Sequence, residues 1–303
     1  KAYQQAVKTR VIASIANTYY TLLMLDKQLE ISLETAEAWK QSVETTRKLM
    51  TIGSANESAV SSTEANYLSV QASLAELRRQ IRETENSLSL LLGQVPQTVD
   101  RGRIDEQELP AHLATGVPVQ LLANRPDVKQ SEMSLASAYY VTNQAYSAFY
   151  PSLTITGALG WTNNAGAAIL NPGKMIASAV GSLTQPLFNK GQLIANLKVA
   201  KAQQEEALLA FQYSLLNAGS EVSNALVLYN SSTEKSKLEA DQVRSLERVV
   251  NYTQQLFNLG SASYLEVLTA QKSLLGAQLS KVSDDFYRMQ AVVNLYYALG
   301  GGR

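Results

Sequence analysis

The sequence predicts a mainly α-helical protein with a small β part, built from long antiparallel coiled-coil helical hairpins in tandem duplication. Three observations support this fold class. Residues 2–51 contain no Gly or Pro, and residues 192–258 contain one Gly and no Pro. The phrase "TRKLMTIGSANESAVSSTE" at 46–64 returns, altered, as "TQQLFNLGSASYLEVLTAQ" at 253–271. A separate segment, residues 149–166, follows the two-residue period of a β-strand.

The duplication has a fixed offset of 207 residues, which aligns residues 11–93 with 218–300 without a gap. Both copies keep an intact Gly-Ser-Ala, at 53–55 and 260–262, and an intact Leu-Gly, at 92–93 and 299–300. This unit is far longer than the 20–50 residues of solenoid repeats. The alternative, two unrelated long helical stretches, explains the scattered identities but not the intact short phrases at one offset.

Helices of this length need a neighbour along their whole length, because an apolar stripe must be covered. A helix over 192–258 would extend roughly 100 Å at 1.5 Å per residue. Apolar residues recur in alternating steps of three and four, which predicts knobs-into-holes packing. The predicted stripe of the first copy is Val60, Thr63, Tyr67, Val70, Leu74, Leu77, Ile81, Thr84, Leu88 and Leu91. That of the second is Leu265, Leu268, Lys272, Leu275, Leu279, Val282, Phe286, Met289, Val293 and Tyr296.

The two Gly-Ser-Ala phrases are predicted to be the turns of the hairpins. Gly is favoured just past a helix C-terminus, where the chain needs positive φ, and Ser can cap the next helix. The tips therefore carry small, uncharged residues: Gly53, Ser54 and Ala55 in one hairpin, and Gly260, Ser261 and Ala262 in the other. Such a tip is either a simple tight turn or a surface that another helix end can approach closely.

The segment "FYPSLTITGALGWTNNAG" has one apolar face, formed by Leu153, Ile155, Leu159 and Trp161, and one face of small and polar residues. Residues 175–188 form a weaker second strand that ends at Pro186. Two interpretations are open: a soluble hairpin packed on a helix, or part of a membrane β-barrel with its apolar face toward lipid. A single hairpin cannot close a barrel, so the second interpretation requires several chains.

The pattern predicts five regions: a first helical repeat at 1–93, an irregular segment at 94–120, a helix at 121–148, a strand pair at 149–190 and a second helical repeat at 191–303. Asn124 is the expected N-cap of the helix at 121–148. The duplication predicts a matching strand pair N-terminal to residue 1, and the helix-like start suggests that a preceding part lies outside this sequence.

The composition points away from several classes of protein. The 26 basic and 26 acidic residues balance, so bulk charge does not favour nucleic-acid binding. The chain has no Cys and one His, His112, which we interpret as an ordinary loop residue. We expect no metal site, no cofactor and no catalytic residues, since acids and bases are scattered along helix faces. No apolar run reaches about 18 residues, so no transmembrane helix is expected.

Several ordered phrases resemble the TolC family of outer-membrane efflux channels, and in particular its drug-efflux lipoprotein subgroup, the NodT type. They span most of residues 120–303 and are "NRPDVKQSEMSLASA" at 124–138, "AFYPSLTITGALG" at 148–160, "QPLFNKGQLIANLKVAKAQ" at 185–203, "EVSNAL" at 221–226, "LGSASYLEVLTAQKSLL" at 259–275 and "NLYYALGGGR" at 294–303. The first half resembles the family through its helix–turn–helix character.

The resemblance implies a homotrimer in the outer membrane of a Gram-negative cell. In the family, each chain gives four strands to a β-barrel, and the helices continue it as a periplasmic α-barrel with an equatorial girdle, here the segment 94–120. The hairpin tips then dock a membrane-fusion adaptor protein that connects to an inner-membrane pump. The implied function is a passive duct that exports drugs or other small toxic compounds.

The resemblance also implies a channel constriction near the second tip. Its position corresponds to Leu265, Thr269 and Lys272, although Thr269 stands where family members often carry an acid. We expect a mainly apolar constriction at Leu265. Lys272 either pairs with a carboxylate on a neighbouring helix or is solvated at a splayed tip.

Two alternatives to drug efflux remain at this point: the outlet of a type I protein-secretion system, and a soluble coiled-coil scaffold. The scaffold explains the hairpins but not the alternating strand. No phosphate-binding GxxxxGK[ST] loop occurs, so energy for transport would come from a partner.

Overall fold

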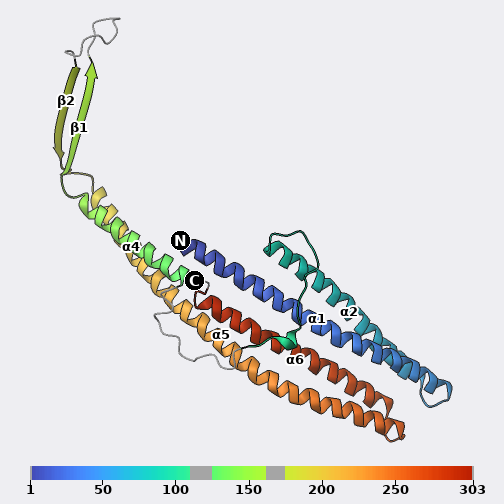
Figure 1. The fold of residues 1–303 in the computed structure, drawn as a ribbon. Coiled ribbons are helices and arrows are strands. Elements are labelled where there is room, and N and C mark those ends of the chain that lie inside the picture. The colour runs from blue at the N-terminus through green and yellow to red at the C-terminus, as the bar shows by residue number, and fades with distance from the viewer. Residues whose placement is uncertain (1, 110–124, 162–174, 302–303) are drawn as a thin grey trace. The chain divides into compact units, whose positions relative to one another are not determined.

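The computed structural model describes residues 2–109, 125–161 and 175–301. It contains four long helices and a shorter one, a single 3₁₀ turn and two strands within those ranges (Figure 1). The elements are α1 (Ala2–Thr51), α2 (Glu57–Leu91), η1 (Ile104–Glu106), α4 (Pro126–Ser147), β1 (Ser152–Trp161), β2 (Met175–Thr184), α5 (Gln192–Asn258) and α6 (Tyr264–Ala298). None of the helices in these ranges combines the length and the apolar character needed to cross a membrane.

Helices α1 and α5 have the bounds that the Gly- and Pro-poor stretches predicted. Helix α1 covers residues 2–51 and α5 covers 192–258, so both end shortly before a Gly-Ser-Ala phrase. The stripe predicted for α2 is confirmed, because all ten of its residues are buried or half-buried. The stripe of α6 is confirmed from Leu268 to Val293 except at Lys272, which is exposed, and Leu265 and Tyr296 at its ends are exposed as well.

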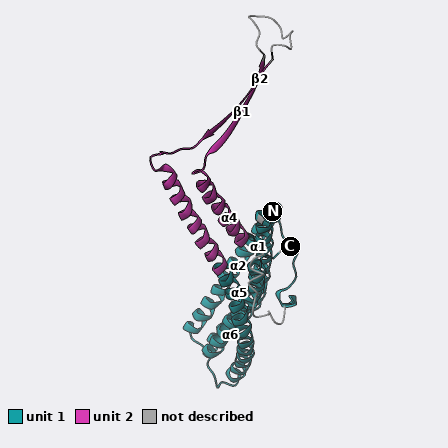
Figure 2. Cartoon of the chain, turned by 90° about the vertical axis from the view of Figure 1, so that its left-hand side faces the viewer, with its two compact units in different colours: residues 1–126, 217–303 teal, residues 127–216 magenta. Residues whose placement is uncertain are grey.

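The chain divides into two compact units (Figure 2). The first, residues 1–126 and 217–303, contains both hairpin tips, and the second consists of residues 127–216. Apolar clusters join α1 to its neighbours in the first unit. One contains Leu22, Leu25, Ile81 and Leu88 and joins α1 to α2; another contains Leu23, Ile31, Ile104, Val282, Phe286 and Met289 and joins α1 to η1 and α6. Helix α1 is therefore the element through which the two hairpins are held together.

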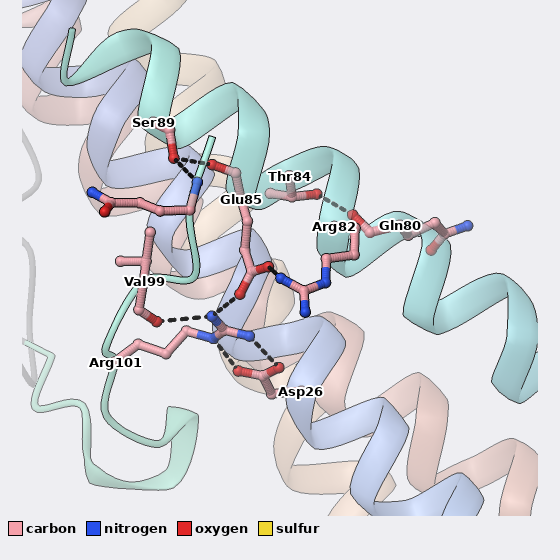
Figure 3. Close-up of polar contacts among 9 residues, drawn as sticks. Asp26, Gln80, Arg82, Thr84, Glu85, Ser89, Val99 and Arg101 are labelled. Atoms are coloured by element: carbon pink, nitrogen blue, oxygen red, sulfur yellow. Dashed lines mark hydrogen bonds and ion pairs between the residues drawn. The ribbon is translucent and has the colours of Figure 1, made fainter. Parts of the chain in front are cut away.

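The irregular segment that follows α2 is fastened to the helices by arginines (Figure 3). Arg101 donates to Asp26 of α1, with Nη2 to Oδ1 at 2.9 Å, and to Glu85 of α2, with Nη1 to Oε1 at 2.7 Å. Arg82 donates to the other oxygen of Glu85 at 3.0 Å. Because the Glu85 side chain is almost completely buried, it needs these charged partners. Arg103 makes a second link, to Glu30. Arg101 and Arg103 thus hold this segment against the first hairpin, whereas 110–120 and His112 lie outside the described residues.

In the second unit, α4 packs on the N-terminal part of α5 through small polar contacts. The hydroxyl groups of Ser131 and Ser214 lie 2.7 Å apart, and Thr142 Oγ1 donates to the Ala200 carbonyl oxygen at 3.2 Å. Helix α4 begins at Pro126, the expected first turn, and the expected cap Asn124 lies outside the described residues.

Strands β1 and β2 form one antiparallel hairpin in which Ser152 pairs with Thr184 and Trp161 with Met175. This register places Leu153 opposite Leu183 and Leu159 opposite Ala177, so residues of the predicted apolar face of β1 share that face with apolar residues of β2. The other face carries Ser, Thr, Ala and Gly, together with Val180 and Ile176 from β2.

Candidate functional site

Both hairpin turns have the backbone geometry of a glycine-terminated helix. Gly53 has φ +75° and Gly260 has φ +72°. The amide of Ser54 donates to the Leu49 carbonyl oxygen at 2.8 Å, and that of Ser261 donates to Leu256 at 2.9 Å. These bonds close the helix C-terminus as in a Schellman motif. A side chain at either glycine meets no neighbouring atom, so it is the positive φ that requires glycine there.

The following helices begin at equivalent caps. Asn56 Oδ1 accepts from the Ala59 amide at 2.9 Å, and Ser263 Oγ accepts from the Glu266 amide at 3.4 Å. In return, the Ser263 amide donates to the Glu266 carboxylate, which completes a capping box. The expected serine cap is therefore found in the second turn, whereas asparagine takes that position in the first. The side chains of Ser54 and Ser261, within the Gly-Ser-Ala phrases, do not cap these helices.

The two turns lie together at one end of the first unit (Figure 1) and line a common groove of about 910 Å³. We call this the tip groove. Five of the six predicted tip residues line it, and Ser261 does not. Its lining carries no charged side chain and consists of Leu49, Gly53, Ser54, Ala55, Asn56, Ser58, Ala59, Ser62, Phe257, Asn258, Gly260, Ala262, Ser263, Tyr264 and Leu265. A neutral surface of small residues recognises a partner through shape and close backbone approach.

One contact links the second turn to the first hairpin, and another braces the second turn itself. The Tyr264 hydroxyl, at the start of α6, donates to the Ser42 carbonyl oxygen of α1 at 3.1 Å. The Tyr264 ring also packs on Phe257 across the second turn, with ring centroids 5.0 Å apart. Below the groove, Trp39 and Leu74 of the first hairpin form a buried cluster with Leu268 of the second. Since this cluster crosses between hairpins, it fixes the separation of the two tips.

The residues predicted for the constriction lie on successive turns of α6. Leu265 lines the tip groove and is 65% exposed, and Thr269 donates its hydroxyl to the Leu265 carbonyl oxygen at 2.8 Å. Lys272 is exposed and contacts no carboxylate within the described part of this chain. The structure therefore presents Leu265, Thr269 and Lys272 outward from the hairpin, and pairing of Lys272 with a neighbouring helix stays a prediction.

The predicted lipid-facing residues of β1 are exposed. Leu153, Ile155 and Leu159 lie on one face of the strand, and each is at least two-thirds exposed. Trp161 ends β1, and its side chain lies outside the described part of the chain.

The sequence reasoning missed Trp39 and Tyr264, which join the two hairpins near their tips, and Phe257, which packs on Tyr264 across the second turn. The signal for them was available, because all three are aromatic residues of the helices that run to the tips. It also missed Arg101 and Arg103, for which no periodic pattern exists in an irregular segment.

Comparisons with known proteins agree with this fold. Residues 1–94 and 117–301 match the family model of outer membrane efflux proteins. The cation efflux system protein CusC of Escherichia coli O6:H1 is 29% identical over an alignment of 304 positions, which covers 99% of this chain and 65% of CusC. The solvent efflux pump outer membrane protein SrpC of Pseudomonas putida is 27% identical over 300 residues, 99% of this chain and 64% of SrpC.

Among solved structures, the outer membrane protein VceC of Vibrio cholerae superposes with a TM-score of 0.88 at 26% identity, over 99% of this chain and 72% of VceC. The chain spans about two thirds of the length of the curated relatives that it matches. The mainly helical fold with tandem hairpins and one strand pair, predicted from the sequence, is confirmed as TolC-like. Because the family model covers nearly all of its residues, the chain belongs to the outer membrane efflux protein family.

Proposed function

We propose that the full-length protein is the outer-membrane channel of a tripartite efflux pump. One observation carries this proposal: the long helices expose large apolar side chains along their length. Within the first unit alone these include Ile12, Leu68, Leu90, Val227 and Leu238, which are between 47% and 79% exposed. Such residues on otherwise paired helices require further helices to cover them. Sister copies of the same hairpins supply that cover when three chains assemble into a hollow α-barrel.

The strand hairpin supports the same assembly. Its exposed face of Leu153, Ile155 and Leu159 suits lipid, and its opposite face of small and polar residues suits a water-filled lumen. In a trimer, strand pairs from all chains close a β-barrel in the outer membrane, and the helices extend into the periplasm. Closure removes the free strand edges, which lipid does not tolerate.

The tip groove is the proposed docking site for a periplasmic adaptor that connects to an inner-membrane pump. The groove is neutral and lined by small residues, so a helical tip of the adaptor can approach its backbone closely. Gly53, Ser54, Ala55, Gly260 and Ala262 line it directly, and Ser261 belongs to the same turn without lining the groove. The pump supplies the energy, and the channel itself carries out no chemical step.

The exported compounds are proposed to be selected by the pump rather than by this chain. A relative named for cation efflux and one named for solvent efflux match the chain to nearly the same degree, at 29% and 27% identity. This similarity supports a passive duct for small toxic compounds whose wall does not discriminate strongly among them. The names of these relatives also favour efflux over protein secretion.

Replacing Ala262 with tryptophan tests the docking proposal. The bulky ring fills part of the tip groove, so adaptor binding and export by the full-length protein are expected to fall by about tenfold or more. Adaptor contact is measured by in-cell cross-linking to the periplasmic adaptor, and export by ethidium efflux. Ser73→Trp, at an exposed position of α2 outside the groove, is the control, and trimer yield is measured for both variants. Undiminished cross-linking and efflux in Ala262→Trp would contradict docking at the groove.

Leu265 is the proposed centre of an apolar constriction in the closed channel, with Thr269 and Lys272 on the following turns. Its 65% exposure in the single chain leaves the side chain available to meet its copies around a three-fold axis. Leu265→Ser is expected to raise the closed-state conductance of the full-length trimer in planar bilayers, because a small polar side chain both widens and wets the narrow point. An unchanged conductance would show that the constriction lies elsewhere.

A further inference from the structure

Charged side chains bridge α5 and α6 midway along the second hairpin. Lys235 Nζ donates to Asp284 Oδ1 at 2.9 Å, and Ser236 Oγ donates to Asp285 Oδ1 at 2.6 Å. Glu239 lies one turn after Lys235 on α5, and its carboxyl group, like that of Asp284, has a buried oxygen. Asp284 is only 3% exposed, and Glu239 is half-buried. Two carboxyl groups from different helices therefore meet in a mostly buried place.

Each of these two carboxyl groups has one oxygen without a partner. Glu239 Oε2 and Asp284 Oδ2 are both inaccessible to solvent, and neither has a hydrogen bond within the described residues. Ionised carboxylates can only accept hydrogen bonds, so two of them in contact repel and leave these oxygens unsatisfied. A single proton removes both defects, because a protonated carboxyl group donates to its ionised neighbour.

The surrounding charges do not neutralise the two groups. Lys235 is the cation that contacts Asp284, and most of its own side chain is exposed. On the α1 side, this turn of α6 meets the neutral amide of Gln28, which donates to Ser283 at 3.3 Å. Nearby charged or titratable groups on α6 are Asp285, Tyr287, and Lys281 and Arg288, which both pair with Asp285. Burial raises the pKa of Glu239 above its ordinary value, and the neighbouring carboxyl group of Asp284 raises it further.

We propose that Glu239 and Asp284 share one proton, and that this carboxyl pair fastens α5 to α6 only while the proton is bound. Loss of the proton places two negative charges against each other and loosens the middle of the second hairpin. The joint is thus a proton-binding site within the wall of the duct, distinct from the tips and from the strand hairpin.

The direction of the pH dependence follows from the raised pKa of Glu239. The folded protein holds the proton at pH values where the unfolded chain has released it. The stability that the carboxyl pair contributes is therefore complete below the ordinary carboxyl pKa of 4.5 and is lost as the pH rises through the raised pKa in the folded state. Glu239→Gln should remove this dependence, since its amide donates to Asp284 at every pH.

The test is a pH series of thermal unfolding on the full-length protein, comparing wild type with Glu239→Gln and with Glu247→Gln, an exposed position on the same helix. We expect the melting temperature of wild type to fall relative to Glu239→Gln above pH 4.5, by about 2–4 °C for each unit by which the pKa is raised. The control Glu247→Gln should follow the wild type. Parallel curves for wild type and Glu239→Gln would overturn the proposal.

Infrared difference spectroscopy of the wild type gives a second readout that does not depend on a variant folding. The carboxylic C=O band of the shared proton should persist above pH 4.5 and disappear only at a higher pH. The same band should be missing from Asp284→Asn or Glu239→Gln, whichever folds. If all carboxyl groups of the wild type lose their protons within the ordinary range, no proton is shared.

Discussion

Trp39→Ala is expected to lower the free energy of unfolding by about 3–5 kcal/mol, the range typical of truncating a large buried aromatic side chain. Trp39 of α1 is 2% exposed and lies in a buried cluster with Ala36 of the same helix. The same cluster includes Leu74 of α2 and Leu268 of α6. The substitution therefore opens a cavity where the two hairpins meet, and the surrounding long helices cannot collapse into it without bending.

Urea unfolding of the full-length protein, followed by far-ultraviolet circular dichroism, measures this effect. Leu33→Ala on the same helix is the matched control, because Leu33 is 44% exposed. Since the buried cluster fixes the separation of the tips, Trp39→Ala should also increase protease cleavage at the turns around Gly53 and Gly260. A loss of stability no larger than that of Leu33→Ala would show that Trp39 does not hold the hairpins together.

Ile155→Lys is expected to abolish stable insertion of the protein into the outer membrane, whereas Thr156→Lys is expected to be tolerated. Both residues lie in the middle of β1, but adjacent strand residues point to opposite faces. Ile155 is 74% exposed on the predicted lipid-facing side. A lysine there costs about 2–4 kcal/mol at the bilayer midplane, and a trimer incurs this cost three times. On the other face, a lysine at 156 extends into the proposed lumen.

The measurement is the amount of heat-resistant trimer in isolated outer membranes. It is compared between these two variants, which change adjacent residues of the same strand. Equal trimer yields for Ile155→Lys and Thr156→Lys would contradict the assignment of the two strand faces. The reverse order, with Thr156→Lys the more damaging, would show that the apolar face is turned away from lipid.

Much of this fold could be predicted because its signals are local. Helix bounds followed from the absence of Gly and Pro, and the turns at Gly53 and Gly260 followed from the need for positive φ. The stripe of α2 was correct throughout because most of it packs on α1, with Leu268 of α6 joining it at Val70 and Leu74. Alternation alone identified the exposed apolar face of β1.

The remainder depends on which distant segments meet, and periodicity does not determine that. The heptad pattern placed Leu265 in a buried stripe, yet at the first turn of α6 the side chain points into the open groove. Arg101 binds Asp26 and Glu85 across 75 and 16 residues of sequence, and the contact of Glu239 with Asp284 likewise joins two helices. Polar contacts of this kind have no repeat that would reveal them before the helices are placed.

The most direct test of the central claim is to determine the mass and the conductance of the full-length protein together. Light scattering in detergent, followed by single-channel recording in planar bilayers, should give a trimer that conducts through one continuous pore. This result is expected because the apolar side chains exposed along α1, α2 and α5 need sister copies to cover them. A stable monomer that gives no conductance would contradict the account of the long hairpins as the wall of a hollow duct.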